Sequence, residues 1–133
     1  MRRFMVSLLA ALWLAVPAAA QEGAIEDVIT RQFEAFRGDD PARAFEFASP
    51  TIRDTFRTPE NFAAMVRRGY PMVWRPGEVR FGPLREVAGQ LWQRVRVRDA
   101  QGREHMLDYQ MKRVDGAWRI NAVQVLKAPG VGV

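Results

Sequence analysis

Apolar side chains recur at two different spacings along the chain. Between residues 25 and 36 they return every three or four positions, and acidic and polar residues fill the positions between them. The apolar positions of this stretch are Ile25, Val28, Ile29, Phe33 and Phe36. This spacing predicts an amphipathic helix. Gly38 follows it and predicts the helix end, because glycine accepts the left-handed conformation that closes many helices.

Three pairs of a polar residue and a proline come next, at Asp40-Pro41, Ser49-Pro50 and Thr58-Pro59. A short polar side chain caps a helix N-terminus, and proline fits the first helical position. The pairs therefore predict three short helices, and the last of them carries an apolar stripe and ends at a glycine.

The second half of the chain has strand character in four runs, residues 78–87, 91–98, 104–114 and 117–126. Short, glycine-containing connections between the runs predict an antiparallel meander. Pro83 predicts a bulge or an edge position within the first run, because proline cannot donate a ladder hydrogen bond.

Alternation within these runs separates the two faces of the sheet. The residues of the predicted apolar face are Val95, Val97, Leu107, Tyr109, Met111, Trp118, Ile120 and Ala122. The predicted polar face carries Arg94, Arg96, Arg98 and Arg119. Since an apolar face must be covered, we expect the helices to pack on it. The predicted fold is α+β, an open roll of N-terminal helices packed on a curved four-stranded antiparallel meander.

The N-terminus predicts export. Two arginines precede an apolar run over residues 4–16, and three alanines follow, ending at Ala20. This order is typical of a secretory signal peptide over residues 1–20, and we expect cleavage after Ala20. The sequence leaves the general secretory and the twin-arginine pathways open. We therefore expect one domain over residues 21–127, a flexible tail over 128–133, and a location in the periplasm or outside the cell.

Composition narrows the chemistry. The 133 residues include no cysteine, which excludes disulfides, thiolate metal sites and a cysteine nucleophile. They include one histidine, which excludes a metal site built from several histidines. No phosphate-binding loop occurs, and we expect neither a metal nor another cofactor. The formal net charge is +5. Because the chain is predicted to be exported, we expect no nucleic-acid partner, and contact with a membrane only through the signal peptide before cleavage.

Two groups of residues are candidates for ligand binding. The segment 70–76 places Tyr70 and Trp74 beside Arg75 and two prolines. We expect an ordered loop there, either a lid over the core or a pocket rim at which Arg75 meets an anion. His105 and Tyr109 fall on one predicted strand face and form a second candidate, a polar pair at the pocket mouth. The four arginines of the polar face either keep that face exposed to water or form a surface that binds a partner.

Several segments carry a resemblance to a small bacterial secreted family. They are residues 24–36, 45–50, 58–62, 69–76, 91–93, 107–111 and 116–121. Together they are similar to the family catalogued as domain of unknown function 4864, over nearly the whole chain after the signal peptide. More loosely, the order of elements resembles the nuclear-transport-factor-2-like and cystatin-like rolls. That superfamily includes isomerases, dehydratases, lipid carriers and non-catalytic dimer modules, so the resemblance implies a fold and selects no function.

These observations leave three hypotheses for the function. The first is a non-enzymatic domain that holds a small apolar, acyl or anionic ligand in a cleft closed by residues 70–76, or that binds a protein partner. The second is a small lyase or isomerase with Tyr109 or His105 as the proton-transfer group, which requires a carboxyl group of raised pKa in an open pocket. The third is a structural homodimer that pairs sheet faces.

Overall fold

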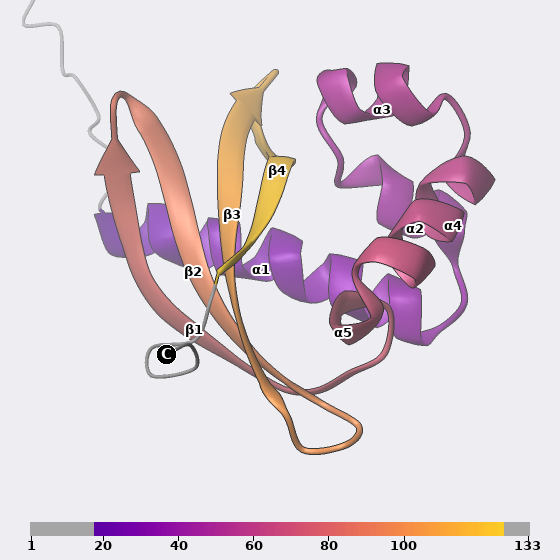
Figure 1. The fold of residues 1–133 in the computed structure, drawn as a ribbon. Helices are drawn as coiled ribbons and strands as arrows, with labels where there is room; N and C mark the ends of the chain where they lie inside the picture. The colour runs from indigo at the N-terminus through magenta and orange to yellow at the C-terminus, as the bar shows by residue number, and fades with distance from the viewer. Residues whose placement is uncertain (1–17, 127–133) are drawn as a thin grey trace, which may run out of the picture.

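The computed structural model describes residues 18–126 and confirms the α+β fold (Figure 1). The helices of this part are α1 (Ala18–Arg37), α2 (Pro41–Glu46), α3 (Pro50–Phe56), α4 (Pro59–Gly69) and α5 (Pro71–Trp74). The strands are β1 (Pro76–Val87), β2 (Gln90–Asp99), β3 (Glu104–Val114) and β4 (Ala117–Leu126). They form one antiparallel sheet in chain order, which is the predicted meander. Among the described helices, none combines the length and the hydropathy needed to span a bilayer.

α1 buries the predicted apolar face, with Ile25, Ile29, Phe33 and Phe36 almost fully covered. Its predicted end at Gly38 is correct in place but wrong in mechanism. The left-handed residue is Asp39, with φ of 52°, while the amide of Gly38 still donates to Glu34 in helical fashion. Aspartate is one of the few residues that tolerate this conformation as a single position.

The three predicted helix starts are confirmed. The side chains of Asp40, Ser49 and Thr58 each accept a hydrogen bond from a backbone amide three residues later, and a proline opens each helix. These bonds satisfy amides that have no partner inside the helix.

The segment between α4 and the sheet differs from its prediction as a loop. Residues 71–74 form the single turn α5, in which the carbonyl oxygen of Tyr70 accepts from the amides of Val73 and Trp74. Pro71 opens this turn, because its fixed φ suits the first helical position. Met72, Val73 and Trp74 are buried, so α5 is part of the core.

The sheet has the predicted strands, with β1 and β2 slightly longer than expected. The register of β1 against β2 shifts between Phe81 and Leu84, which confirms the predicted irregularity at Pro83. Two-residue turns join β1 to β2 and β3 to β4, and both central residues of each have positive φ. These are the turns that match the twist of a hairpin.

A second bulge changes the predicted alternation of β4. Met111 of β3 pairs with Ile120, but Gln110 pairs with Ala122, so Asn121 is an extra residue on β4. The face assignment therefore reverses beyond Asn121: Val123 shares a face with Tyr109, and Ala122 lies on the opposite face. The prediction that Ala122 belongs to the apolar face is wrong for this reason.

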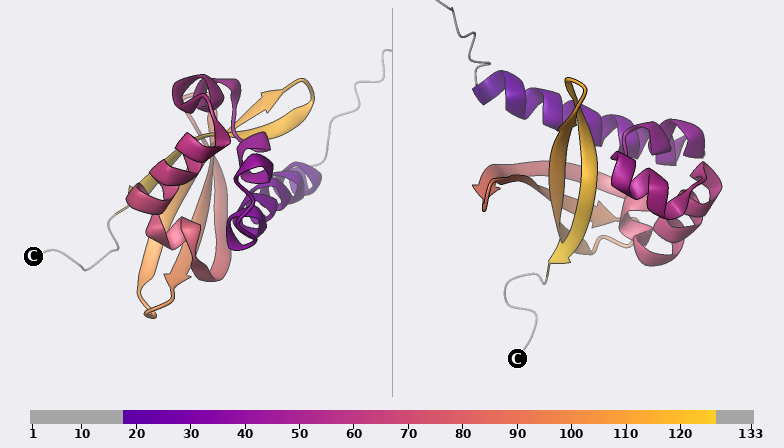
Figure 2. Two further views of the ribbon diagram at one scale, coloured as in Figure 1. Left: turned by 90° about the vertical axis from the view of Figure 1, so that its right-hand side faces the viewer. Right: turned by 90° about the horizontal axis from the view of Figure 1, so that it is seen from above.

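The helices lie on the apolar face of the sheet. α1 crosses that face, while α2 to α5 gather at one end of the sheet (Figure 2), where α3 contacts β4 and α5 contacts β1 and β2. The sheet residues in the core are Gln93, Val95, Val97, Leu107, Tyr109, Met111 and Ile120. This arrangement leaves two hollows at the end of the sheet where the short helices meet it.

Candidate ligand-binding sites

The first hollow lies between α3, α4, α5 and the free edge of β4, and we call it the β4 groove. Its volume is about 280 Å³. It is lined by Ile52, Phe56, Phe62, Met65, Val66, Tyr70, Val73, Ile120, Asn121, Ala122 and Val123. None of these side chains is a carboxylate, a guanidinium, an ammonium or an imidazole. The groove can therefore hold apolar material but contains no acid or base.

A short bridge joins the helical segment to β4 at Ile120, a residue that lines the β4 groove. The amide of Ile120 donates to Phe47, and the amide of Ser49 donates to Ile120, which makes one rung of parallel pairing. The Ser49 hydroxyl donates to Asn121 Oδ1 at 2.8 Å, and Asn121 Nδ2 donates to Gln110 Oε1 at 2.7 Å. The bulge that turns Asn121 toward Ser49 therefore also fixes the groove wall.

Of the two candidate tyrosines, one lines the β4 groove and the other is buried in the core. Tyr70 lines it and donates to the carbonyl oxygen of Val123 at 3.3 Å. Tyr109 lies behind it in the core, 1% exposed, with its ring centroid 6.2 Å from that of Phe33. Burial, and secondarily the neighbouring Tyr70, raise the pKa of Tyr109. Its hydroxyl has no hydrogen-bond partner among the described residues.

The second hollow lies on the other side of α5, and we call it the Trp74 pocket. Its volume is about 300 Å³. It is lined by Arg67, Pro71, Met72, Trp74, Arg75, Asp99, Ala100, Gln101, Arg103 and His105. Of the candidate ligand-binding residues, the structure brings Trp74, Arg75 and His105 together at this pocket, whereas Tyr70 lines the β4 groove and Tyr109 lies in the core.

Arg75 is held by its own chain. Its guanidinium group donates to the carbonyl oxygens of Phe36 and Trp74 at 2.7 and 3.0 Å, and to Asp39 at 2.5 Å. It also lies over the indole ring of Trp74, with Cζ 4.8 Å from the ring centroid. These contacts connect the end of α1 to the end of α5. Arg75 is therefore a structural clamp at the rim.

His105 is paired with Asp99 rather than with Tyr109. The distance from His105 Nε2 to Asp99 Oδ2 is 2.8 Å. The amides of Gln101 and Arg103 and the Nε of Arg103 also donate to this carboxylate. The hydrogen bond from His105 is the largest influence on the pKa of Asp99, and burial, which raises it, is the second. Together with the backbone amides and the charge of Arg103, the hydrogen bond lowers this pKa to about 2.

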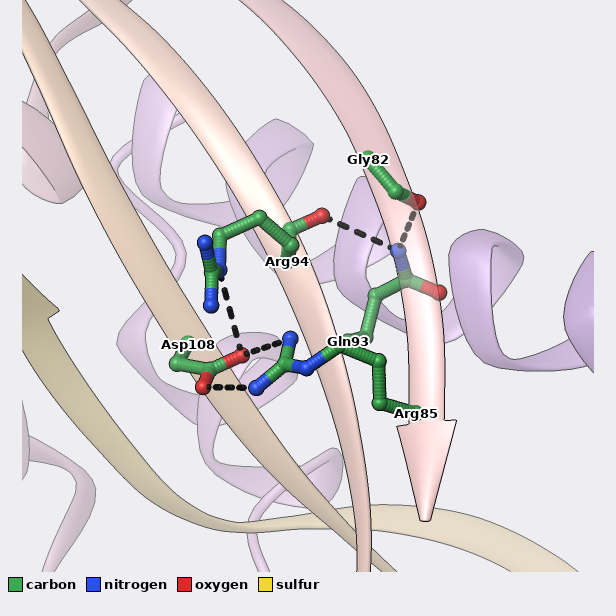
Figure 3. Close-up of polar contacts among 5 residues, drawn as sticks. All are labelled: Gly82, Arg85, Gln93, Arg94 and Asp108. Atoms are coloured by element: carbon green, nitrogen blue, oxygen red, sulfur yellow. Dashed lines mark hydrogen bonds and ion pairs between the residues drawn. The ribbon is translucent and has the colours of Figure 1, made fainter. Parts of the chain in front are cut away.

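The predicted arginine surface lies on the outer face of the sheet, and acids neutralise much of it. Figure 3 shows the carboxylate of Asp108 between two guanidinium groups, bound twice by Arg85 at 2.6 and 3.0 Å and lying 3.6 Å from Arg94 Nε. Arg98 pairs with Glu104 at 3.3 Å.

The other two members of the predicted surface differ in position. Arg96 lies between Arg94 and Arg98 on β2 and is exposed. Arg119 lies opposite Lys112 in the register of β3 and β4, at the other end of the outer face. The four arginines therefore do not form one continuous patch.

Gln93 lies in the core and bonds to the backbone of β1 and β2. It is fully buried, and its Nε2 donates to the carbonyl oxygens of Gly82 and Arg94 at 2.8 and 2.9 Å (Figure 3). The bulge beside Pro83 leaves the Gly82 carbonyl outside the regular ladder, and the side-chain Nε2 of Gln93 supplies the missing donor.

Sequence reasoning missed Asn121, Asp99, Arg67 and Arg103 as residues of these sites. Asp99 and Arg103 flank a turn, where polar residues are expected for local reasons, and Asn121 is unusual only because of the bulge. Within residues 18–126, no group of three or more histidine and acidic side chains is arranged to hold a metal ion.

Comparison with known proteins identifies a family but no activity. A family model described as domain of unknown function (DUF4864) matches residues 18–133. No curated protein matches the chain.

Proposed function

The chain belongs to the DUF4864 family, whose description as a domain of unknown function names no activity. We therefore propose a function from the geometry of the β4 groove. The protein is a non-enzymatic, exported binding domain that holds a neutral, apolar small molecule or acyl chain in the β4 groove. The observation that carries this proposal is the lining of the groove, which is apolar apart from Tyr70 and Asn121. Its volume of about 280 Å³ is close to the lower end of small-molecule sites.

The polar groups of the groove favour an uncharged ligand. Asn121 already bonds Ser49 and Gln110 through both ends of its amide. Tyr70 donates its proton to Val123, so its oxygen is left as an acceptor. No cation lines the groove to neutralise an acid, and a buried anion without a partner is costly. A ligand with an apolar body and at most one hydrogen-bond donor fits these groups.

An acid–base enzyme receives little support from the same residues. A lyase or isomerase needs a carboxyl group or imidazole beside the substrate, and the groove lining has neither. Where a carboxyl pKa is shifted, at Glu78 and Asp99, hydrogen bonds from Arg80 and His105 lower it, which is the wrong direction for a general acid. The raised pKa of Tyr109 keeps its phenol protonated.

A dimer through the outer sheet face is also weakly supported. Asp108 and Glu104 already pair with Arg85, Arg94 and Arg98, so fewer charges are left for a partner.

Export remains part of the proposal, and α1 is compatible with it. The expected cleavage after Ala20 would remove the first turn of α1. Residues 18–20 are exposed, and the first buried side chain of α1 is Ile25. Cleavage there would leave every buried contact of the helix intact.

A fluorescent probe tests the groove directly. N-phenyl-1-naphthylamine is neutral and apolar and becomes bright on leaving water. We expect saturable binding to the purified protein, weakened about tenfold or more by Met65→Asp, because the new charge would be desolvated by a ligand. Ala64→Asp is the matched control: Ala64 is the exposed neighbour of Met65 and does not line the groove.

Either of two results would overturn the proposal: no saturable signal, or equal binding to both aspartate variants. If Met65→Asp fails to fold, as judged by circular dichroism, Ile52→Asp on α3 introduces the same charge from the other side. Native mass spectrometry of protein recovered from a bacterial periplasm then shows whether a small molecule of fixed mass is retained.

A further inference from the structure

The Trp74 pocket lies outside the β4 groove and is lined by charged side chains, whereas the groove has none. Its lining includes three guanidinium groups and one carboxylate. The question for such a pocket is which of these groups are already satisfied by the chain and which are left for a ligand.

The carboxylate is fully engaged. The oxygens of Asp99 accept from His105, from the amides of Gln101 and Arg103, and from the Nε of Arg103. Its side chain is 9% exposed. A cationic ligand would have to displace these donors, so the pocket does not favour a cation.

Two of the three guanidinium groups, those of Arg67 and Arg103, have most of their donors unused, whereas Arg75 uses three of its five. Arg75 is committed to Phe36, Trp74 and Asp39. Arg103 uses its Nε for Asp99, and among residues 18–126 its two terminal nitrogens have no partner. Arg67 forms no hydrogen bond or ion pair within the described chain and lies over the indole of Trp74, with Cζ 4.8 Å from the ring centroid.

These two cations come from different elements and meet at one cavity. Arg67 is in the last turn of α4, and Arg103 is in the hairpin between β2 and β3. Pro71, Met72 and Ala100 contribute apolar walls between them. Guanidinium groups present paired donors that match carboxylate and phosphate oxygens, and apolar walls favour an anion that carries an apolar body.

We propose that the Trp74 pocket is a second binding site, which takes a small organic anion, a carboxylate or a phosphate ester, between Arg67 and Arg103. Arg75 and His105 shape the site without holding the anion: Arg75 fixes α5, and His105 fixes Asp99 and with it Arg103. The site does not depend on the ligand of the β4 groove, since α5 separates the two hollows.

The test is a titration followed by the indole N–H resonance of Trp74 in ¹H–¹⁵N NMR spectra, with Trp74→Phe used to assign that signal. The probes are inorganic phosphate, acetate and benzoate, each at constant ionic strength set with sodium chloride. Saturable shifts with phosphate but with neither carboxylate would indicate a phosphate site. Saturable shifts that are stronger with benzoate than with acetate would indicate a carboxylate site with an apolar wall.

Variants separate the site from general surface charge. We expect Arg67→Gln and Arg103→Gln each to weaken binding about tenfold, the loss of one charged hydrogen bond. Arg68→Gln is the matched control, because Arg68 is the next residue of the same helix end and does not line the pocket. Its affinity should stay within about twofold of the original, since exposed charges at this range are screened by salt.

The proposal is wrong if none of the three anions gives a saturable shift, or if Arg68→Gln weakens binding as much as Arg67→Gln does. Naphthylamine binding in the groove serves as an independent readout. It should be unchanged in Arg67→Gln, so failure of the anion site and failure of the groove can be told apart.

Discussion

The β4 groove and the Trp74 pocket share a wall but differ in almost every polar group. α5 is that wall: Tyr70 and Val73 line the groove, and Pro71, Met72 and Trp74 line the pocket. Residues three apart share one side of a helical turn, so a single turn can serve two sites of different chemistry. The groove is uncharged, whereas the pocket holds arginines, Asp99 and His105. A cluster of aromatic and basic residues in the sequence therefore need not mark one site.

The largest effect that separates the two regions is expected at the floor of the groove. Phe62 is 5% exposed, and its ring lies 5.4 to 6.0 Å from the rings of Phe45, Phe56 and Phe36. Phe62→Ala should lower the free energy of unfolding by about 3 to 5 kcal/mol, measured by urea denaturation. Val87→Ala, at a side chain that is 51% exposed, should change it by less than about 0.5 kcal/mol. A loss of under about 1 kcal/mol for Phe62→Ala would mean that the groove floor is loosely packed.

A loss of the outer network should lower stability and leave both hollows intact. Asp108 is 7% exposed in its side chain and faces Arg85 and Arg94. Asp108→Asn should cost about 2 kcal/mol, because partly buried guanidinium groups lose their counter-charge. Glu104→Gln removes an exposed pair and should cost less than about 1 kcal/mol. If Asp108→Asn altered naphthylamine or anion binding, the outer face and the hollows would be coupled, contrary to the structure.

Loss of the bridge between Ser49 and β4 should lower stability and loosen the β4 groove without altering the Trp74 pocket. Ser49 is fully buried, caps α3 and donates to Asn121. Ser49→Ala should lower the free energy of unfolding by about 1 to 2 kcal/mol through the lost cap and the unpaired Asn121 oxygen. Hydrogen exchange should rise at the amides around Ile120. Thr58→Ala is the comparison, since Thr58 caps α4 at an exposed position away from β4. Equal exchange in the two variants would contradict the role of the bridge.

The smallest effect concerns the Trp74 pocket at low pH. The folded protein holds the pKa of Asp99 at about 2, below its ordinary value of 3.8. As the pH falls below about 4, the unfolded chain takes up this proton before the folded chain does, so stability is lost down to a pH of about 2 and is fully present above about 4. Asp99→Asn should show a shallower loss over this window in urea denaturation at a series of pH values. Parallel curves for the two proteins would mean that Asp99 titrates normally.

The sequence determined which segments form most of the elements, but it predicted a loop where α5 forms. Apolar spacing identified α1 and the four strands, because burial of one face requires a period of 3.6 or of 2. Polar-proline pairs located α2, α3 and α4, because capping and the fixed φ of proline act locally. Each of these signals needs only residues a few positions apart, so no knowledge of the tertiary structure is required. The likeness to nuclear-transport-factor-2-like rolls stays a prediction.

Tertiary structure alone decided which residues meet. The bulge at Asn121 moved Ala122 to the outer face, and a one-residue insertion of this kind leaves no mark in composition. Arg75 became a clamp because the end of α1 lies beside it, whereas Arg67 and Arg103 line one cavity although they are 36 positions apart in the sequence. Local preference fixes a backbone segment by segment, but a binding site is a set of distances between segments, and those distances exist only after the core has packed.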